Sequence, residues 1–317
     1  MSPAILIIEM IAHLVLIFVF LALLYVTIRR RDQIYRYIRS SRVIYWSILS
    51  ICGLFALLAV LRVVFLMSVG VSTPTTMLLD LLITFLGLVA QSLVIYALIA
   101  RKIILLRAVQ PRRVLAIAAH PDDLELSVGA TLACLKDHGH MVACLVMSHG
   151  GRGGDGDARL QEAYQSAKFL GFAHIKVLDL DDTRLDAYPN EMIRAIEDML
   201  AQFKPDLILT HSPHEVHQDH LAVYHATLRA ARSHSSILCY EGPSVTADFH
   251  PTFFIDISGY VDVKLEAVRK HRDQRSKPYL REDLVEGNLA FRGGQSKVAY
   301  AEGFEVERVL SSTIGEL

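Results

Sequence analysis

The chain has 317 residues, with 32 Lys and Arg against 33 Asp and Glu, so its formal net charge is −1. Hydrophobic residues make up 52% of the chain and the mean hydropathy is +0.35, which excludes an ordinary soluble domain. Most of the apolar excess lies in three runs at 4–28, 44–67 and 77–100. Each run reaches the roughly 20 residues that a helix needs to cross a bilayer. We therefore predict a membrane domain, residues 1–110, with three transmembrane helices.

The basic residues between these runs predict an orientation. The first link carries six arginines against the single Asp32, whereas the second link, "SVGVSTPTT", has no charge, and five more basic residues lie within 101–113. By the positive-inside rule, the first link and everything after the third run are cytoplasmic, and the N-terminus lies outside. The four cysteines have no paired spacing, which is typical of reduced thiols in that compartment.

Three charged side chains fall inside the apolar runs, namely Glu9, Arg62 and Asp80. A charge within a bilayer is costly unless it is paired, and the predicted orientation places all three at a similar depth. We expect Arg62 to pair with Asp80 or Glu9 and so to lock the helices together. A polar binding site that faces the outer leaflet is the alternative interpretation.

From residue 111 the pattern changes to short β-rich runs that alternate with helical segments, which predicts βαβ units. The predicted strands lie near 113–119, 141–147, 174–178, 206–210, 237–240 and 252–257. The predicted helices lie near 125–138, 157–170, 190–203, 218–232, 260–274 and 280–291. We predict one α/β domain, residues 111–317, with a Rossmann-like, mainly parallel sheet and helices on both faces.

Polar segments follow three of the predicted strands, at the sheet edge where chemistry gathers in such folds. They read "HPDDLE", "SHGGRGGDGDARLQEA" and "THSPHEVHQDH". His120 and Asp123 are three residues apart on a predicted turn, and His217 and His220 are three apart at the start of a helix. Two histidines and one carboxylate around an open position would form a catalytic zinc site. Zinc lowers the pKa of a bound water to about 7, so the remaining carboxylate could take its proton.

Each motif also has a purely structural interpretation. A His-Pro-Asp-Asp turn is often only a helix N-cap, because Asp caps helices well and Pro ends a strand. A pair of histidines on a helix is weak evidence for a metal, and a solvated histidine-rich loop would look similar. The occurrence of both motifs at neighbouring strand ends favours the metal site.

The combination of motifs resembles the PIG-L/LmbE-like de-N-acetylase family, over about 112–310. The first family motif, A-H-P-D-D-x-E, is present at 119–125, and the last, P-x-D-x-H-x-D-H, is matched at 213–220. The two intervening motifs, S-x-G-E-x-G-G and R-x-x-E-A, are matched at 148–154 and 159–163. The resemblance implies an LmbE-like fold for the cytoplasmic domain.

The resemblance also implies roles for the residues of the first and last motifs. His120, Asp123 and His220 would hold zinc, one ion per chain, with Fe²⁺ as the alternative metal. Asp122 would be the general base. His217 would face the scissile carbonyl as general acid or oxyanion stabiliser.

Other positions have an implied role next to a structural alternative. Asp219 would orient and charge His217, with helix capping as the alternative. Arg159 matches an arginine that contacts substrate, and Glu162 would brace it, with a surface pair between the two as the alternative. Of the remaining histidines near the site, we expect His211 to contact substrate, because it directly follows a strand.

Two positions depart from the family pattern. Gly151 stands where the family has Glu, and Glu215 stands where it has Asp. Neither is an implied metal ligand, and the second change is chemically mild. The first change affects the glycine-rich loop around Arg152, which we expect to be mobile, to close over a sugar and to contact it through Arg152.

The resemblance implies a hydrolase that removes the acetyl group from an N-acetylated amino sugar of the GlcNAc type. Because the predicted spans anchor the domain, we expect the lipid bilayer as a partner and a lipid-linked substrate at the cytoplasmic leaflet. The alternatives are a soluble GlcNAc conjugate of the thiol-precursor type and a non-catalytic, sugar-binding membrane receptor. The chain has no P-loop and no G-x-G-x-x-G motif, and we expect no nucleic-acid partner. The sequence does not predict an oligomeric state.

Overall fold

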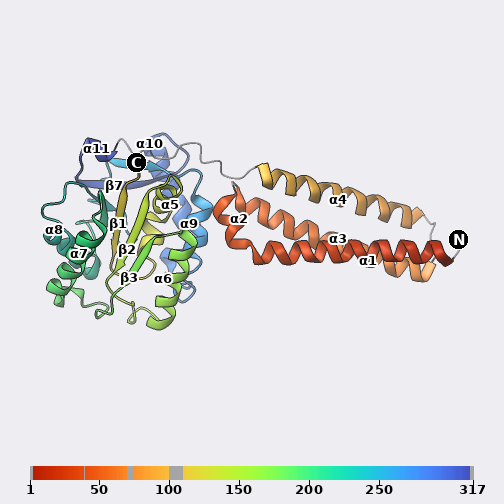
Figure 1. Ribbon diagram of the computed structural model, residues 1–317, viewed down its shortest axis with the longest axis horizontal. Helices are drawn as coiled ribbons and strands as arrows, with labels where there is room; N and C mark the ends of the chain where they lie inside the picture. The colour runs from red at the N-terminus through yellow and green to blue at the C-terminus, as the bar shows by residue number, and fades with distance from the viewer. Residues whose placement is uncertain (1–2, 39, 70–73, 100–109, 315–317) are drawn as a thin grey trace. The chain divides into compact units, whose positions relative to one another are not determined.

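The computed structural model describes residues 3–38, 40–69, 74–99 and 110–314. The chain divides into two compact units, Met1–Ile103 and Ile104–Leu317. Figure 1 shows long helices in the first unit and a sheet covered by helices in the second.

The described part of the first unit consists of helices joined by short turns. Its helices are α1 (Pro3–Arg29), α2 (Arg31–Tyr37), α3 (Ser41–Val69) and α4 (Pro74–Ile99). Three of them contain apolar stretches long enough to cross a membrane, at Met10–Arg29, Ser41–Phe65 and Leu78–Tyr96. The predicted apolar helices are therefore confirmed. The basic link between the first two is itself helical, as α2, which the sequence analysis did not predict.

A charged cluster lies between the apolar helices. Arg62 of α3, with 2% of its surface exposed, donates two hydrogen bonds to Asp80 of α4, from Nε at 2.7 Å and from Nη2 at 3.0 Å. His13 Nε2 of α1 lies 3.8 Å from the same carboxylate. The predicted pairing of Arg62 with Asp80 is confirmed, whereas the side chain of Glu9 lies outside the described residues.

The second unit is built on one seven-stranded sheet in the order β3-β2-β1-β4-β5-β7-β6. The strands are β1 (Arg113–Ala118), β2 (Met141–Val146), β3 (His174–Val177), β4 (Leu207–His211), β5 (Ile237–Tyr240), β6 (Phe253–Asp256) and β7 (Ala301–Arg308). The first five pair in parallel, and β7 runs antiparallel to both of its neighbours. The predicted mainly parallel sheet is confirmed.

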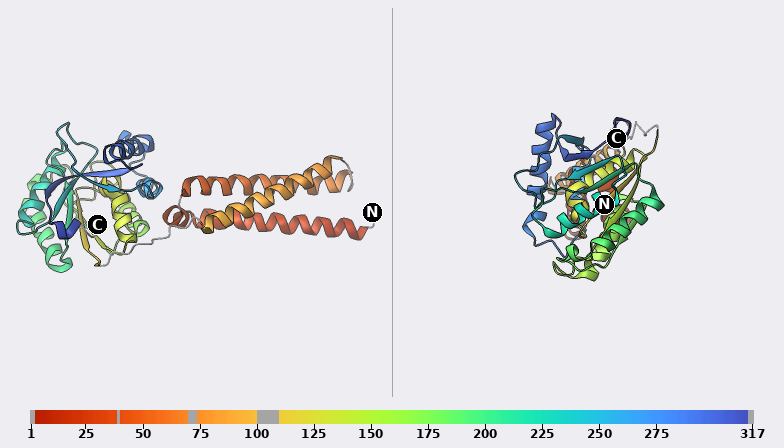
Figure 2. Two further views of the ribbon diagram at one scale, coloured as in Figure 1. Left: turned by 90° about the horizontal axis from the view of Figure 1, so that it is seen from above. Right: turned by 90° about the vertical axis from the view of Figure 1, so that its left-hand side faces the viewer.

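Helices cover both faces of this sheet because side chains alternate along β1. Leu115 and Ile117 face the layer of α7 (Pro189–Phe203) and α8 (Gln218–Ala230). Val114 and Ala116 pack against α5 on the other face. That second layer comprises α5 (Asp123–Asp137), α6 (Gly156–Leu170) and α9 (Val261–Val268). Figures 1 and 2 show the two layers from different directions.

The order of the strands in the sheet determines where the site lies. The chain moves from β1 outward through β2 to β3, and then returns to the other side of β1 with β4 and β5. Ligands of open α/β sheets bind at such a reversal, beyond the carboxyl ends of the strands. The HPDD turn after β1 and the histidine-rich segment after β4 therefore meet there.

One predicted helix ends earlier than expected. The helix predicted at 260–274 stops at Val268, and the chain then passes through turns to a 3₁₀ segment, η2 (Pro278–Leu280). The side chains of His271 and Gln274 in these turns are buried against the site. The chain then forms α10 (Glu282–Ser296) before β7, and α11 (Ser311–Ile314) follows.

Candidate active site

The turn after β1 holds two adjacent carboxylates in different environments. The amide of His120 donates to Asp123 Oδ2 at 2.8 Å, which closes the turn at the start of α5. Asp122 has a φ of 108°, in the left-handed region that non-glycine residues rarely adopt. Such strain costs on the order of 1–3 kcal/mol and typically persists at functional sites. The two carboxylates are thereby separated in direction, although they are neighbours in sequence.

Three buried side chains from the two motifs meet beside this turn. The ligand atoms of His120, Asp123 and His220 all lie within 4.8 Å of one another. His220 Nε2 lies 3.4 Å from Asp123 Oδ1, and His120 Nδ1 lies 3.6 Å from Asp123 Oδ2. The structure thus brings together the three residues that the resemblance implied as metal ligands.

The donor chemistry of this trio fits a divalent metal such as zinc, because two imidazoles and a carboxylate leave a further position open. Two other groups satisfy the same distance criterion: His120, His217 and Asp219, and His211, Glu215 and His220. In the first, both oxygens of Asp219 already accept hydrogen bonds from backbone amides. In the second, neither His211 nor Glu215 lines the cavity. The trio of His120, Asp123 and His220 is therefore the best candidate.

Glu215 and His211 pack against the side of His220 that faces away from the cavity. Glu215 Oε2 lies 3.3 Å from His220 Nδ1 and accepts a hydrogen bond from Ser244. The ring of His211 stacks on that of His220 with centroids 4.0 Å apart. His211 has no exposed surface and does not line the cavity, so the expected substrate contact needs correction. His211 is the last residue of β4, which extends one residue beyond the predicted strand, and it packs behind the metal-ligand candidate His220.

The carboxylates around His220 set its charge. Burial lowers the pKa of His220, but Asp123 and Glu215 outweigh this effect and raise it to about 9. Burial raises the pKa of Glu215, whereas its contacts with His211 and His220 lower it to about 2. Glu215 is thus a permanent anion that orients an imidazole, as an outer partner of a metal ligand does.

Asp122 has the properties of a proton acceptor. Burial and the adjacent Asp123 raise its pKa to about 6, while the nearby Arg159 opposes the rise. Its Oδ1 accepts a hydrogen bond from Arg159 at 3.1 Å, whereas its buried Oδ2 has no hydrogen-bond partner among the described residues. The unpartnered oxygen belongs to a residue that lines the cavity, so it is available to a reacting group.

Arg159 is held by the protein itself. It is 4% exposed, and besides Asp122 its guanidinium donates to the carbonyl oxygens of Pro121 (2.9 Å) and Gly150 (2.7 Å). It therefore ties the glycine-rich loop to the HPDD turn. Glu162 accepts the amide of Asp273 at 3.3 Å, so in the described part of the chain it neither braces Arg159 nor forms the alternative surface pair.

His217 presents a neutral ring to the cavity. Its Nδ1 accepts a hydrogen bond from the amide of Asp219 at 3.2 Å, at the start of α8. Burial lowers the pKa of His217, and the neighbouring His220 and His120 lower it further. Because Nδ1 acts as an acceptor, the single proton of the neutral ring lies on Nε2. His217 can therefore donate a hydrogen bond to an oxygen in the cavity.

Two carboxylates converge on His120. Asp219 Oδ2 lies 3.0 Å and Asp182 Oδ1 lies 3.1 Å from His120 Nε2. Asp219 was expected to orient His217, but its carboxylate contacts His120 and the amides of Thr183 and Leu185 instead. Sequence reasoning missed Asp182 altogether. The only signal was its place among the acidic residues that follow β3.

The cavity over these residues has a volume of about 320 Å³. Asp182 closes one side of it and accepts the amides of Arg152 (2.7 Å) and Gly153 (3.1 Å), which fixes the glycine-rich loop. The side chain of Arg152 is exposed at the rim. Lys277 and Tyr279, from the segment after α9, complete the lining, and the sequence analysis had not singled them out.

Comparisons with known proteins agree with this geometry. The family described as "PIG-L: GlcNAc-PI de-N-acetylase" matches residues 115–231. The uncharacterized deacetylase YaiS of Escherichia coli K12 is 40% identical over 166 residues, which cover 50% of this chain and 90% of that protein. The diacetylchitobiose deacetylase of Thermococcus kodakarensis is 32% identical over 224 residues, which cover 61% of this chain and 82% of that protein.

A solved structure shows the same fold. The N,N'-diacetylchitobiose deacetylase from Pyrococcus horikoshii has a TM-score of 0.55 and 24% identity, and the alignment covers 62% of this chain and 83% of that one. At this identity the likeness concerns the fold alone. It confirms the LmbE-like α/β architecture that the motifs implied.

Proposed function

Because this chain belongs to the PIG-L de-N-acetylase family, we propose that it is a metal-dependent hydrolase that removes the N-acetyl group from a GlcNAc-type sugar. One observation carries the proposal. The candidate ligands His120, Asp123 and His220 lie in the same cavity as Asp122, which has a raised pKa and an unpartnered oxygen. A site with this composition suits hydrolysis of an amide by water.

A bound zinc ion would supply Lewis acidity, polarising the acetamide carbonyl and lowering the pKa of a water molecule. Asp122 accepts the proton of the attacking water at its free Oδ2. A pKa of about 6 suits both halves of the reaction, because the group is ionised at neutral pH yet can return the proton to the departing amine. Acetate and the free amino sugar are the products.

His217 stabilises the oxygen that gains negative charge. A neutral imidazole with its proton on Nε2 donates a hydrogen bond without a change of protonation. Of the two roles implied for His217, the geometry therefore favours oxyanion stabilisation over general acid catalysis. Asp219 and Asp182 act through His120 as positioning residues, because both contact its Nε2.

The finer proposal concerns the substrate and its location. Three apolar helices of membrane-spanning length precede the catalytic unit, which supports an integral membrane protein. The arginine-rich first link supports a cytoplasmic catalytic unit and an outside N-terminus. An enzyme anchored in this way meets sugars on lipid carriers at the cytoplasmic leaflet, so we propose a lipid-linked GlcNAc as substrate. A soluble conjugate, processed by the same chemistry, is the second candidate.

Acetate release tests both the proposed deacetylase activity and the proposed lipid-linked substrate. The full-length protein, loaded with zinc in lipid nanodiscs, is incubated with a lipid extract and separately with soluble GlcNAc conjugates, with and without a chelator. Mass spectrometry should show chelator-sensitive loss of an acetyl group from lipid-linked sugar. Equal turnover of the soluble conjugates would remove the reason for a lipid substrate. Binding of sugar without any acetate release would instead indicate a non-catalytic receptor.

A further inference from the structure

A second cavity lies next to the catalytic one. It has a volume of about 270 Å³ and is lined by residues of α5, α9, α10, β7 and the segment after β5. Pro243 and Tyr279 line both cavities and so stand at the junction between them. Leu126 and Ser127, which line the second cavity, lie in the first turns of α5, the helix that begins at Asp123. None of the residues in this cavity takes part in the proposed chemistry.

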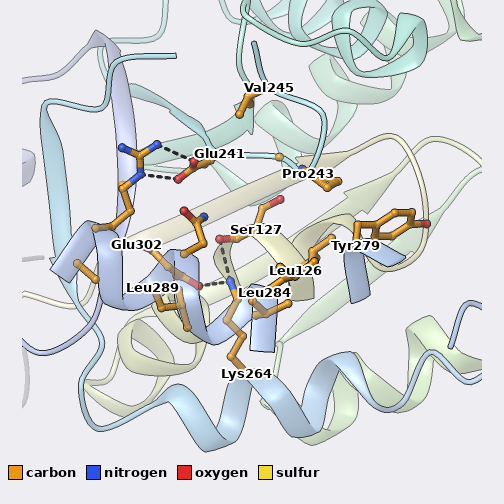
Figure 3. Close-up of a pocket in the computed structure, with 16 residues that line it drawn as sticks. Leu126, Ser127, Glu241, Pro243, Val245, Lys264, Tyr279, Leu284, Leu289 and Glu302 are labelled. Carbon is orange, nitrogen blue, oxygen red and sulfur yellow. Dashed lines mark hydrogen bonds and ion pairs between the residues drawn. The ribbon is translucent and has the colours of Figure 1, made fainter. Parts of the chain in front are cut away.

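Two ion pairs form the polar part of this cavity. Arg292 donates to Glu241 through Nε at 2.8 Å and Nη2 at 2.6 Å. Lys264, which is buried, contacts Glu302 and donates to the carbonyl oxygen of Ser127 at 3.0 Å. Figure 3 shows both pairs in the wall of the cavity. Two carboxylates and two cations give no net charge, so the cavity has no excess positive charge to bind a phosphate.

Most of the remaining lining is apolar. It includes Leu126, Leu284 and Tyr279, while Pro243 and Val245 lie on the side of Glu241, as Figure 3 shows. Leu284 and Tyr279 are exposed, and Asn288, one turn after Leu284 on α10, adds an exposed amide to the lining. The cavity therefore combines hydrogen-bonding groups with aliphatic and aromatic surface.

We infer that this cavity is a second sugar subsite, which binds the sugar unit linked to the one that is deacetylated. The inference rests on the proposed function. A pyranose ring has hydroxyl groups at its edges and C–H groups on its faces, which matches a wall that carries both hydrogen-bonding and apolar groups. An alkyl chain would remove the ion pair of Glu241 and Arg292 from water without adding a hydrogen bond to either, which is unfavourable. The glycosidic bond would pass between Pro243 and Tyr279.

Two tryptophan variants on α10 test the subsite. Asn288→Trp places a large ring in the cavity, and Ala290→Trp places the same ring at an exposed position of the same helix that does not line it. Binding is measured by calorimetry on the full chain in nanodiscs, in an Asp122→Asn background that prevents turnover. The ligands are N,N'-diacetylchitobiose, GlcNAc and the octyl glycoside of GlcNAc.

The parent protein should bind the disaccharide about tenfold more tightly than GlcNAc, and Asn288→Trp should abolish this gain. Ala290→Trp should retain the gain, and GlcNAc binding should stay the same in all three proteins. Equal binding of the two sugars, equal effects of the two variants or no sugar binding would overturn the subsite. A gain for the octyl glycoside alone would show an apolar aglycone instead. Acetate release by protein with Asp122 intact tests the proposed function separately, since deacetylation without a disaccharide preference would refute only the subsite.

Discussion

Replacing Arg159 by Met should shift the pH dependence of catalysis. Arg159 is buried, contacts Asp122 at 3.1 Å and lowers the pKa of that carboxyl. An opposite charge at this distance typically lowers a carboxyl pKa by about 1–3 units, so its removal should raise the pKa of Asp122 by a similar amount. A bound cation lowers the pKa of Asp122 in both proteins, and the comparison isolates the contribution of the arginine.

The pKa of Asp122 in the metal-free site sets the upper limit of the effect. A pKa of about 6 leaves Asp122 roughly nine-tenths ionised at pH 7, whereas a pKa of about 7 to 9 would leave about half to one-hundredth ionised. Because a bound cation lowers both values, the rate at pH 7 should fall by up to about a hundredfold and recover as the pH rises. The variant should also unfold more easily, by about 3–5 kcal/mol, because a buried ion pair loses one partner.

The assay is the pH profile of kcat/KM for acetate release, measured for the parent protein, Arg159→Met and the control Arg232→Met. Arg232 forms an exposed pair with Glu197, so its loss should leave both the profile and the stability nearly unchanged. The acidic limb of the Arg159→Met profile should move to higher pH. A lower kcat/KM with the limb at its original pH would refute this reasoning and indicate a substrate contact instead.

Three further predictions concern metal binding and the apolar helices. Glu215→Gln should weaken zinc affinity about 10–100-fold, measured by competition with a chromogenic chelator, because His220 loses its anionic partner; unchanged affinity would contradict this role. In the parent protein, zinc affinity should fall at least tenfold per pH unit below 9, because the ion must displace the protons of His220 and His120, whose pKa values are both raised; a flat pH dependence would argue against these ligands. Arg62→Leu should lower the melting temperature in nanodiscs by leaving Asp80 without its guanidinium partner, and the double variant with Asp80→Leu should recover most of the loss; equal melting temperatures would mean that the pair does not lock the helices.

Much of the sheet can be predicted from sequence because its strands are buried on both faces. The run from Arg113 to Ala118 is apolar at almost every position, and the structure buries it between two helical layers. The end of α9 could not be predicted in the same way. His271 and Gln274 look like surface residues of a continuing helix, and only the neighbouring site explains why the chain turns to bury them.

The residues of the site could likewise be predicted only in part from the sequence. The spacing within the compact motifs suggests that His120, Asp123, His217 and His220 share an ion site. The family resemblance, and not the spacing, implies His120, Asp123 and His220 as the ligands. Asp182 lies in a run of similar acidic residues, and nothing local distinguishes the one that contacts His120. A sequence motif also does not specify the direction in which a side chain points. His211 was expected to follow a strand, but it is the last residue of β4, and its ring stacks on that of His220.

The central claim is that the two adjacent carboxylates have different roles, Asp122 as the base and Asp123 as a metal ligand. Asp122→Asn tests this claim most directly. Asn tolerates the positive φ at this position, so the turn should keep its shape. Metal content and acetate release are measured on the same purified samples of parent and variant. The variant should hold one zinc ion per chain, as the parent does, while its kcat falls by about 10²–10⁴-fold. Turnover close to that of the parent would contradict the assignment of Asp122 as base, and loss of the ion would contradict the assignment of Asp123 as the carboxylate that binds it.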